Sequence, residues 1–195
     1  MPTPRCSLSA LLVIVCFAVA GCTTGQPARS PEPLAVVRED PMAGLFPQIS
    51  ETGPRHLNSV CMTDRQIQAD LFTRLRTQMM VTGLTCASLL ERPDLFYSYQ
   101  GFLQNHGNVV RVVQQELGWV LSAGRSGRAD RLYDTYVTGL ANEESVLAAD
   151  ISPARYCSIR SSQFQRASQF SAWDLQAYLD EAWRREVELY PRCAA

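Results

Sequence analysis

The chain has 195 residues, of which 46% are hydrophobic and 19% are charged, and its formal net charge is −1. All of its basic residues are arginine. This balance leaves no basic excess of the kind that binds phosphate backbones, so nucleic acid is excluded as an expected partner. After the first 58 residues, about 135 remain, which is enough to bury one sizeable hydrophobic core.

Residues 1–21 have the pattern of a bacterial export signal. Arg5 supplies positive charge, and the apolar run LSALLVIVCFAVA follows it. The run has roughly the 7 to 15 residues of a signal-peptide core, and it is shorter than the roughly 20 residues that a membrane span needs. We therefore expect residues 1–21 to be a signal peptide.

The segment VAGC at residues 19–22 resembles the lipobox of bacterial lipoproteins, with a small residue before the cysteine and an aliphatic residue three before it. The resemblance implies that Cys22 receives a diacylglyceryl thioether, becomes the new N-terminus and is acylated there, for example with palmitate. Thr23 stands where lipoproteins retained at the inner membrane typically carry aspartate, which implies the outer membrane, facing the periplasm. The alternative is an ordinary secretory signal in which Cys22 is incidental.

Residues 22–58 are expected to form a lipidated, flexible tether. The segment is rich in proline, glycine and serine and has no sustained hydrophobic period. Such a composition cannot bury enough apolar surface to offset the entropy of ordering the chain. The membrane is therefore the expected partner through Cys22, and the domain begins after the tether.

Residues 59–195 carry helical periodicity with little strand-like alternation, which predicts an all-α domain. TDRQ at residues 63–66 matches a capping box. Apolar residues then recur every four positions, and Gly83 is the expected helix end. A second long helix is expected over residues 93–118.

The second half of the domain is expected to contribute two further helical regions. Apolar residues spaced by three and four predict a helix over about residues 133–151, ended by Pro153. A fourth region is expected from Pro153 to Tyr190, with a break near residues 168–171. The predicted fold is an up-and-down bundle of about four helices.

Four cysteines lie in the domain, and an even number in an exported chain indicates disulfides. Cys61 and Cys86 bracket the first helix, so roughly 30 Å separates them, whereas a disulfide needs Cα atoms within about 7 Å. In an up-and-down bundle Cys86 and Cys157 share one end, and Cys61 and Cys193 share the other. The predicted disulfides are therefore Cys86–Cys157 and Cys61–Cys193, and no metal site is expected because the spacing of zinc ligands is missing.

Two polar residues, His106 and Glu144, fall on the apolar stripes of the second and third helices. In an antiparallel pair of helices both residues would lie in the middle of the bundle, so we expect His106 and Glu144 to form a buried polar pair. Such a pair is usually structural, joined by a charge-assisted hydrogen bond. The functional alternative is a general acid–base pair.

Three arginines and two tyrosines are further candidates for contact with a ligand or a partner. Arg125 and Arg128 lie in the turn AGRSGRAD and Arg131 follows it directly; the three could bind an anion, although a solvated turn is the commoner case. Tyr97 and Tyr178 fall off their apolar stripes and are expected to be exposed contact residues. No hydrolase elbow or phosphate loop is present in the sequence, so no catalytic residue and no cofactor are predicted.

Four short segments carry a resemblance over roughly residues 70–157: LRTQMMVTGLTC, GFLQNHGNVVR, YVTGLANEES and RYC. They are similar to segments of a group of small uncharacterised exported helical proteins of alphaproteobacteria. The resemblance implies Cys86–Cys157 as the common bridge, with Cys61–Cys193 as an addition. It supplies no activity.

The sequence thus predicts a lipid-anchored periplasmic envelope protein, with a structural or protein-interaction role and an envelope protein as a possible partner. The first alternative is a module that binds a small ligand or the cell wall. The second is an enzyme that uses His106 and Glu144.

Overall fold

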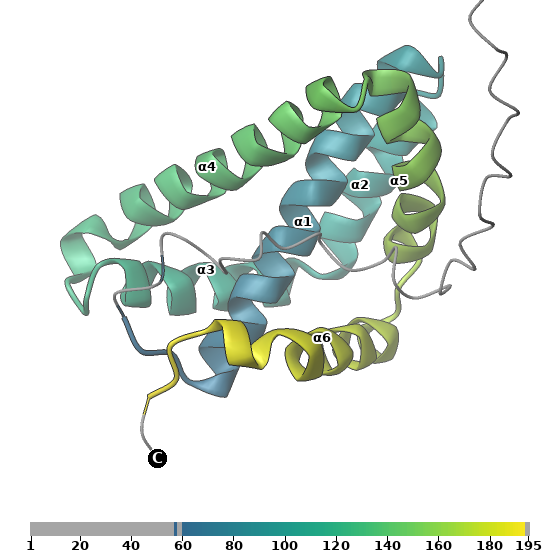
Figure 1. Ribbon diagram of the computed structural model, residues 1–195. Helices are drawn as coiled ribbons and strands as arrows, with labels where there is room; N and C mark the ends of the chain where they lie inside the picture. The colour runs from purple at the N-terminus through teal and green to yellow at the C-terminus, as the bar shows by residue number, and fades with distance from the viewer. Residues whose placement is uncertain (1–56, 58–59, 194–195) are drawn as a thin grey trace, which may run out of the picture. The chain divides into compact units, whose positions relative to one another are not determined.

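The computed structural model describes Leu57 and residues 60–193, and this part of the chain is helical. Its longest helix, α1, packs against each of the other five α-helices and runs through their middle (Figure 1). The all-α, disulfide-linked fold expected from the sequence is confirmed. The elements are α1 (Asp64–Leu89), α2 (Asp94–Asn105), α3 (Gly107–Leu121), η2 (Ser126–Arg128), α4 (Ala129–Asp150), α5 (Pro153–Ser168), α6 (Ala172–Glu186) and η3 (Val187–Leu189).

The start of α1 is capped as the sequence predicts. The Thr63 side chain accepts a hydrogen bond from the backbone N–H of Gln66, and the Gln66 side chain accepts one from the N–H of Thr63. This reciprocal arrangement satisfies two N–H groups that a helix start otherwise leaves unpaired.

The end of α1 differs from the expectation, because the helix continues past Gly83 to Leu89. At Gly83, a Cβ atom would lie 3.4 Å from the Phe164 ring, an ordinary van der Waals contact, so the glycine lies where α1 packs on α5. The expected helix over residues 93–118 is also corrected: it is two helices, α2 and α3, with a break at His106. The bundle therefore has six α-helices in its described part instead of about four.

The remaining boundaries follow the sequence more closely. α4 ends just before Pro153, and α5 and α6 are separated near residues 168–171, as expected. Ser171 caps α6 by accepting from the Asp174 N–H. α6 crosses α1 near its N-terminal end (Figure 1), where the Gln68 side chain donates to Asp180 at 3.0 Å.

Both predicted disulfides are present. Cys86 and Cys157 join α1 to α5 with Cα atoms 5.5 Å apart, and Cys61 and Cys193 join the two ends of the described chain with Cα atoms 4.7 Å apart. The backbone reinforces the second bridge, because the Cys193 N–H donates to the Met62 carbonyl at 3.2 Å. Reasoning from helix order alone had therefore selected the correct pairing from the three possible ones.

One continuous core fills the space around α1. Its largest fully buried side chains include Tyr156, Phe72 and Phe102. Leu57, which the sequence assigned to the tether, is also completely buried. The core, the capping contacts and both disulfides all lie within Leu57 and residues 60–193.

The N-terminal features expected from the sequence lie almost entirely outside the described residues. The signal peptide (residues 1–21) and the lipidated Cys22 lie outside the described residues, and so does the expected tether apart from Leu57. Within the described part, no helix combines the length and apolar character needed to cross a bilayer.

Candidate functional site

Asp70 is the centre of a buried cluster of polar side chains. Its carboxylate is fully buried and accepts hydrogen bonds from the Tyr136 hydroxyl, from the Tyr190 hydroxyl at 2.6 Å and from Arg74 Nε at 2.8 Å. These donors come from α4, from the segment after η3 and from the next turn of α1. We call Asp70, Arg74, Tyr136 and Tyr190 the Asp70 cluster.

The electrostatics of the Asp70 cluster keep its donors protonated. Burial lowers the pKa of Arg74, but the adjacent Asp70 carboxylate and the two tyrosines raise it by more than burial lowers it. The net shift of the Arg74 pKa is therefore upward. Burial and the Asp70 charge raise the pKa of Tyr136 and of Tyr190. Both hydroxyls therefore remain hydrogen-bond donors to Asp70 at neutral pH.

Glu186 lies next to this cluster and is 5% exposed. Burial raises its pKa to about 7, with Arg74 opposing the shift and Asp70 adding to it. Its Oε2 atom has no hydrogen-bond partner among the described residues. Within the Asp70 cluster and its surroundings, Glu186 is therefore the acid whose protonation changes near neutral pH.

A second buried cluster joins α4 to α5. Glu144 Oε1 accepts from the Tyr156 hydroxyl at 2.8 Å and lies 3.2 Å from Arg160 Nε. Thr82 on α1 shares a 3.0 Å hydrogen bond with the same Tyr156 hydroxyl. With its amide oxygen turned toward Arg160, Gln78 accepts from Arg160 Nε at 3.0 Å. We call these five residues the Glu144 cluster.

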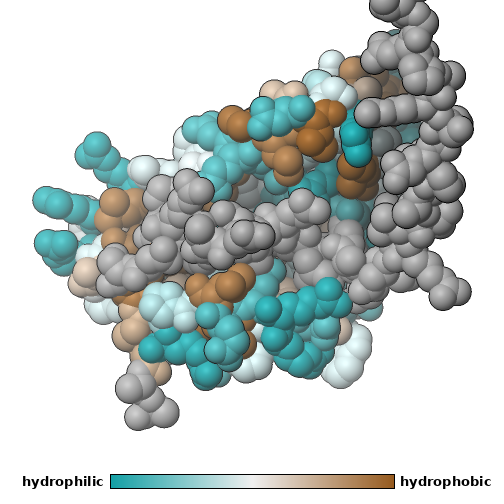
Figure 2. Space-filling model, in the orientation of Figure 1, coloured by the Kyte–Doolittle hydropathy of each residue, from teal (hydrophilic) through white to brown (hydrophobic). Residues whose placement is uncertain are grey.

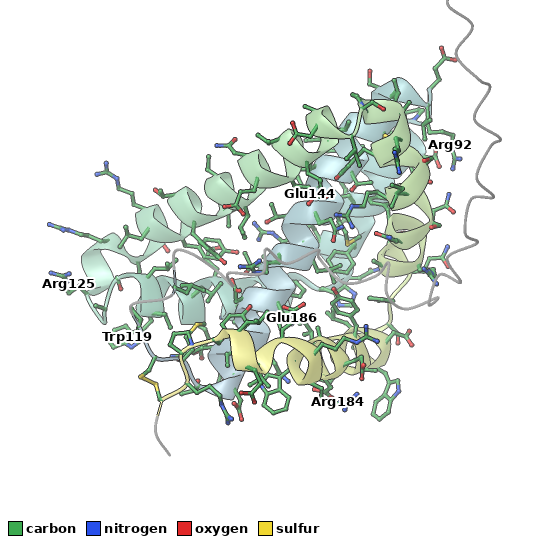
Figure 3. All side chains as sticks on the ribbon, in the orientation of Figure 1. Arg92, Trp119, Arg125, Glu144, Arg184 and Glu186 are labelled. Carbon is green, nitrogen blue, oxygen red and sulfur yellow. A yellow bond between two sulfur atoms is a disulfide. The ribbon has the colours of Figure 1, made fainter. Side chains whose placement is uncertain are left out.

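Tyr178 of α6 is a further buried side chain with a polar group. Burial raises the pKa of Tyr178, the Glu186 charge adds to that shift, and Arg160 opposes it. Tyr178 was expected to be an exposed contact residue, but it is 3% exposed, so that prediction is wrong. Figure 3 shows Glu144 and Glu186 on their separate helices. Tyr97, in contrast, is 67% exposed, as predicted.

His106 and Glu144 do not form the expected pair. His106 is buried at the break between α2 and α3, where Nε2 lies 3.0 Å from the Phe170 carbonyl oxygen. Glu144 contacts Tyr156 and Arg160 instead. His106 contacts Phe170 and Glu144 contacts Arg160, and these two partners lie ten residues apart along and just beyond α5. At about 1.5 Å per residue, roughly 15 Å therefore separates His106 from Glu144. The reason is the helix break, which places His106 at one end of α5 and leaves Glu144 near the other.

A cavity of about 710 Å³ lies along α4. Tyr136 is among the residues that line it, and its hydroxyl donates to Asp70, so the cavity borders the Asp70 cluster. Its lining combines apolar and polar side chains, as ligand pockets do. Gly139 lines the cavity together with Leu121, Arg131, Leu132, Thr135 and Asn142.

Sequence reasoning missed the Asp70 cluster. Asp70 and Arg74 are spaced by four residues, which is typical of an ion pair on the exposed face of a helix. The pair is buried because α4, α6 and the C-terminal segment all cover that face, and nothing local in the sequence reveals this. Arg160 and Gln78 were missed for the same reason.

No family model, no curated protein and no solved structure matches the chain. Within the described part, no group of three or more histidine, cysteine, aspartate or glutamate residues is placed to hold a metal ion. The two polar clusters bond mainly to themselves, which favours a rigid helical scaffold.

Proposed function

We propose that this protein is a lipid-anchored envelope protein of the bacterial periplasm, attached through Cys22 and facing the periplasm from the outer membrane. Its helical domain has a structural or protein-interaction role. The observation that carries the proposal is the pairing of all four cysteines of the domain, Cys61 with Cys193 and Cys86 with Cys157. Paired cysteines are typical of oxidising compartments such as the periplasm, which agrees with the export signal and lipobox in the sequence.

An interaction role is supported by apolar side chains at the corner between α1 and α2. Leu89, Leu90 and Tyr97 are 46%, 43% and 67% exposed. Large exposed apolar side chains that lie together often mark a protein contact. The buried clusters support the same role indirectly, because they hold the helices in fixed positions and so keep this corner rigid.

The test is a cross-linked purification of the protein from its own envelope, with partners identified by mass spectrometry. We expect the wild-type chain in the membrane fraction with a stoichiometric partner. Cys22→Ala should release the chain from the membrane and lose the partner, and a different membrane anchor should restore it. A Leu90→Ser/Tyr97→Ala variant should lose the partner while staying at the membrane.

The controls separate the two parts of the proposal. The mass of the N-terminal peptide reports acylation of Cys22 directly, and an unmodified Cys22 would contradict the lipid anchor. Trp173→Ala removes an even more exposed aromatic side chain from α6 and should keep the partner. If no variant changes the set of captured proteins, the interaction role is wrong.

A second candidate function is the binding of a small ligand, and the cavity along α4 favours it. A volume of about 710 Å³ falls in the range of small-molecule sites. Gly139→Leu would place a bulky side chain in this space from α4. If a cell-wall fragment or metabolite protects the wild-type chain from thermal unfolding and fails to protect this variant, ligand binding is the better account.

A further inference from the structure

The turn between α3 and α4 gathers one exposed aromatic side chain and three exposed arginines. Trp119 is 56% exposed at the end of α3, and Arg125, Arg128 and Arg131 follow around the turn and into α4. We call these four residues the arginine corner. Figure 3 shows Trp119 and Arg125 at the same end of the domain, and Figure 2 shows hydrophilic side chains protruding there.

The arginine corner is held in place by tight backbone contacts. Gly118 meets Ala129 so closely that a Cβ atom on the glycine would lie 3.2 Å from that residue, which brings α3 against α4. Gly124, with φ of +77°, leaves room for the Trp119 ring, since a Cβ atom there would lie 3.2 Å from the ring. Arg125 Nε donates to the Ser122 carbonyl at 3.3 Å. The tryptophan is therefore presented on a fixed turn.

The charges of the arginine corner are available for an external anion. No carboxylate in the described residues forms an ion pair with Arg125, Arg128 or Arg131, although Asp130 and Asp134 are nearby in sequence. Other exposed arginines do have such partners, as Arg92–Asp94 shows at 2.6 Å, and so do Arg184 and Arg185 with Glu181. Arg111 and Arg155 are also exposed without such a partner among the described residues, so the corner differs in bringing three of these arginines together beside Trp119 on one turn.

The chain enters the helical domain next to this corner. Arg65, in the first turn of α1, forms a 2.7 Å ion pair with Glu116, which lies one turn before Trp119 on α3. Figure 1 shows the start of the described chain on the same side as the turn from α3 to α4. About 35 residues separate Cys22 from Leu57, a length that spans at most roughly 120 Å when extended. A lipid on Cys22 would therefore keep the corner within reach of the bilayer.

We propose that the arginine corner docks onto the anionic surface of the membrane that carries the lipid anchor. This inference rests on the proposed lipid anchor. Trp119 enters the interfacial layer, where tryptophan side chains are enriched in membrane proteins. The guanidinium groups bind lipid phosphates, to which their planar donors are well matched. Because the lipid supplies attachment, the corner needs only to orient the helical domain.

The first test measures docking without relying on natural acylation. The chain from Cys22 onward contains every described contact, and its Cys22 thiol is free to couple to a maleimide lipid in vesicles while the two disulfides stay intact. The vesicles are phosphatidylcholine with or without phosphatidylglycerol, and their acyl chains carry bromine, which quenches tryptophan fluorescence on contact. We expect at least twofold more quenching in the phosphatidylglycerol vesicles.

Matched variants assign this signal to the corner. Trp119→Phe should abolish the extra quenching, whereas Trp173→Phe, at an even more exposed tryptophan, should keep it. Arg125→Gln/Arg128→Gln should weaken binding of the uncoupled chain to the anionic vesicles about 25-fold, since each arginine near such a surface contributes about fivefold. Arg111→Gln/Arg155→Gln removes the same charge from exposed positions on α3 and α5 and should have a much smaller effect.

Three results would overturn the docking proposal. They are equal quenching in both kinds of vesicle, quenching that survives Trp119→Phe, and equal losses in the two arginine pairs. Quenching absent from both vesicle types would overturn it as well. None of these results depends on acylation in the cell, which the mass of the N-terminal peptide tests separately.

Discussion

Asp70 brings together three parts of the chain that are far apart in sequence. It accepts from Arg74 on its own helix, from Tyr136 on α4 and from Tyr190 after η3. A buried carboxylate is costly unless its oxygens are paired and hydrogen-bonded. Here each oxygen has a donor, so the charge acts as a specific link between elements.

Replacing Asp70 with asparagine tests this link. The Asp70→Asn variant leaves Arg74 buried without its counter-charge, and we expect the free energy of unfolding to fall by about 3 kcal/mol. Urea unfolding followed by circular dichroism measures the change. Asp94→Asn breaks an exposed ion pair with Arg92 and should change the unfolding midpoint little. Equal stability of Asp70→Asn and the wild type would show that the cluster does not hold the fold.

Glu186 makes stability depend on pH. Its pKa is raised from 4.5 to about 7 in the folded state. Between these values the unfolded chain releases the proton while the folded chain retains it, so stability falls as pH rises through this window. Below pH 4.5 the group is protonated in both states and has no effect, and above pH 7 its destabilising effect is complete.

The Glu186→Gln variant removes that pH dependence. We expect it to be more stable than the wild type at pH 8, by up to about 3 kcal/mol, with the difference vanishing near pH 4. Urea unfolding across this pH range measures the difference. Glu188→Gln, which removes an exposed carboxylate two residues away, is the control. A difference between Glu186→Gln and the wild type that is the same at every pH would contradict the assignment.

At the scale of elements, the break between α2 and α3 decides how the bundle is arranged. α2 packs on α1 and α5, whereas α3 packs on α1 and α4, so one straight helix could not make both sets of contacts. His106 stands at the break and reaches the Phe170 carbonyl between α5 and α6. Its ring also packs on Phe102, with ring centroids 4.7 Å apart.

Replacing His106 with leucine should therefore affect stability. The variant removes the hydrogen bond between the buried His106 ring and the carbonyl of the half-buried Phe170, and we expect a loss of about 1 kcal/mol. Thermal unfolding measures it, with Asn105→Leu at the exposed neighbouring position as the control. If His106→Leu unfolds like the wild type but abolishes the protein's role in the cell, His106 is functional and its structural assignment is wrong.

At the scale of the whole described domain, the two disulfides differ in exposure. Cys86 and Cys157 are both fully buried, whereas Cys61 is exposed and Cys193 is half-buried. Thiol–disulfide exchange requires access to a sulfur atom. The bridge between the chain ends is therefore the accessible one, and the bridge between α1 and α5 is protected by the core.

Limited reduction should separate the two bridges. With increasing reductant under native conditions, we expect Cys61 and Cys193 to react with an alkylating agent first, and Cys86 and Cys157 only when the domain unfolds. Mass spectrometry of the alkylated peptides measures the order. Simultaneous reduction in folded protein, or earlier reduction of Cys86–Cys157, would contradict the prediction.

The sequence by itself determined the helical class, the capping box at Thr63, the break before α6 and the disulfide pairing. These features depend on local periodicity, on short-range hydrogen bonds and on the order in which helices reverse direction. The lipobox around Cys22 is likewise a local pattern, and it remains a proposal.

The tertiary structure alone decided that α1 and α3 continue through their glycines and which residues form the buried polar clusters. Gly83 and Gly118 look like helix ends in the sequence, yet both lie inside helices, where Gly83 faces Phe164 and Gly118 lets Ala129 approach closely. Asp70 and Arg74 have the spacing of a surface ion pair, yet α4 and the C-terminal segment bury them. In each case the decisive contact comes from a residue far away in the chain, which local sequence rules cannot see.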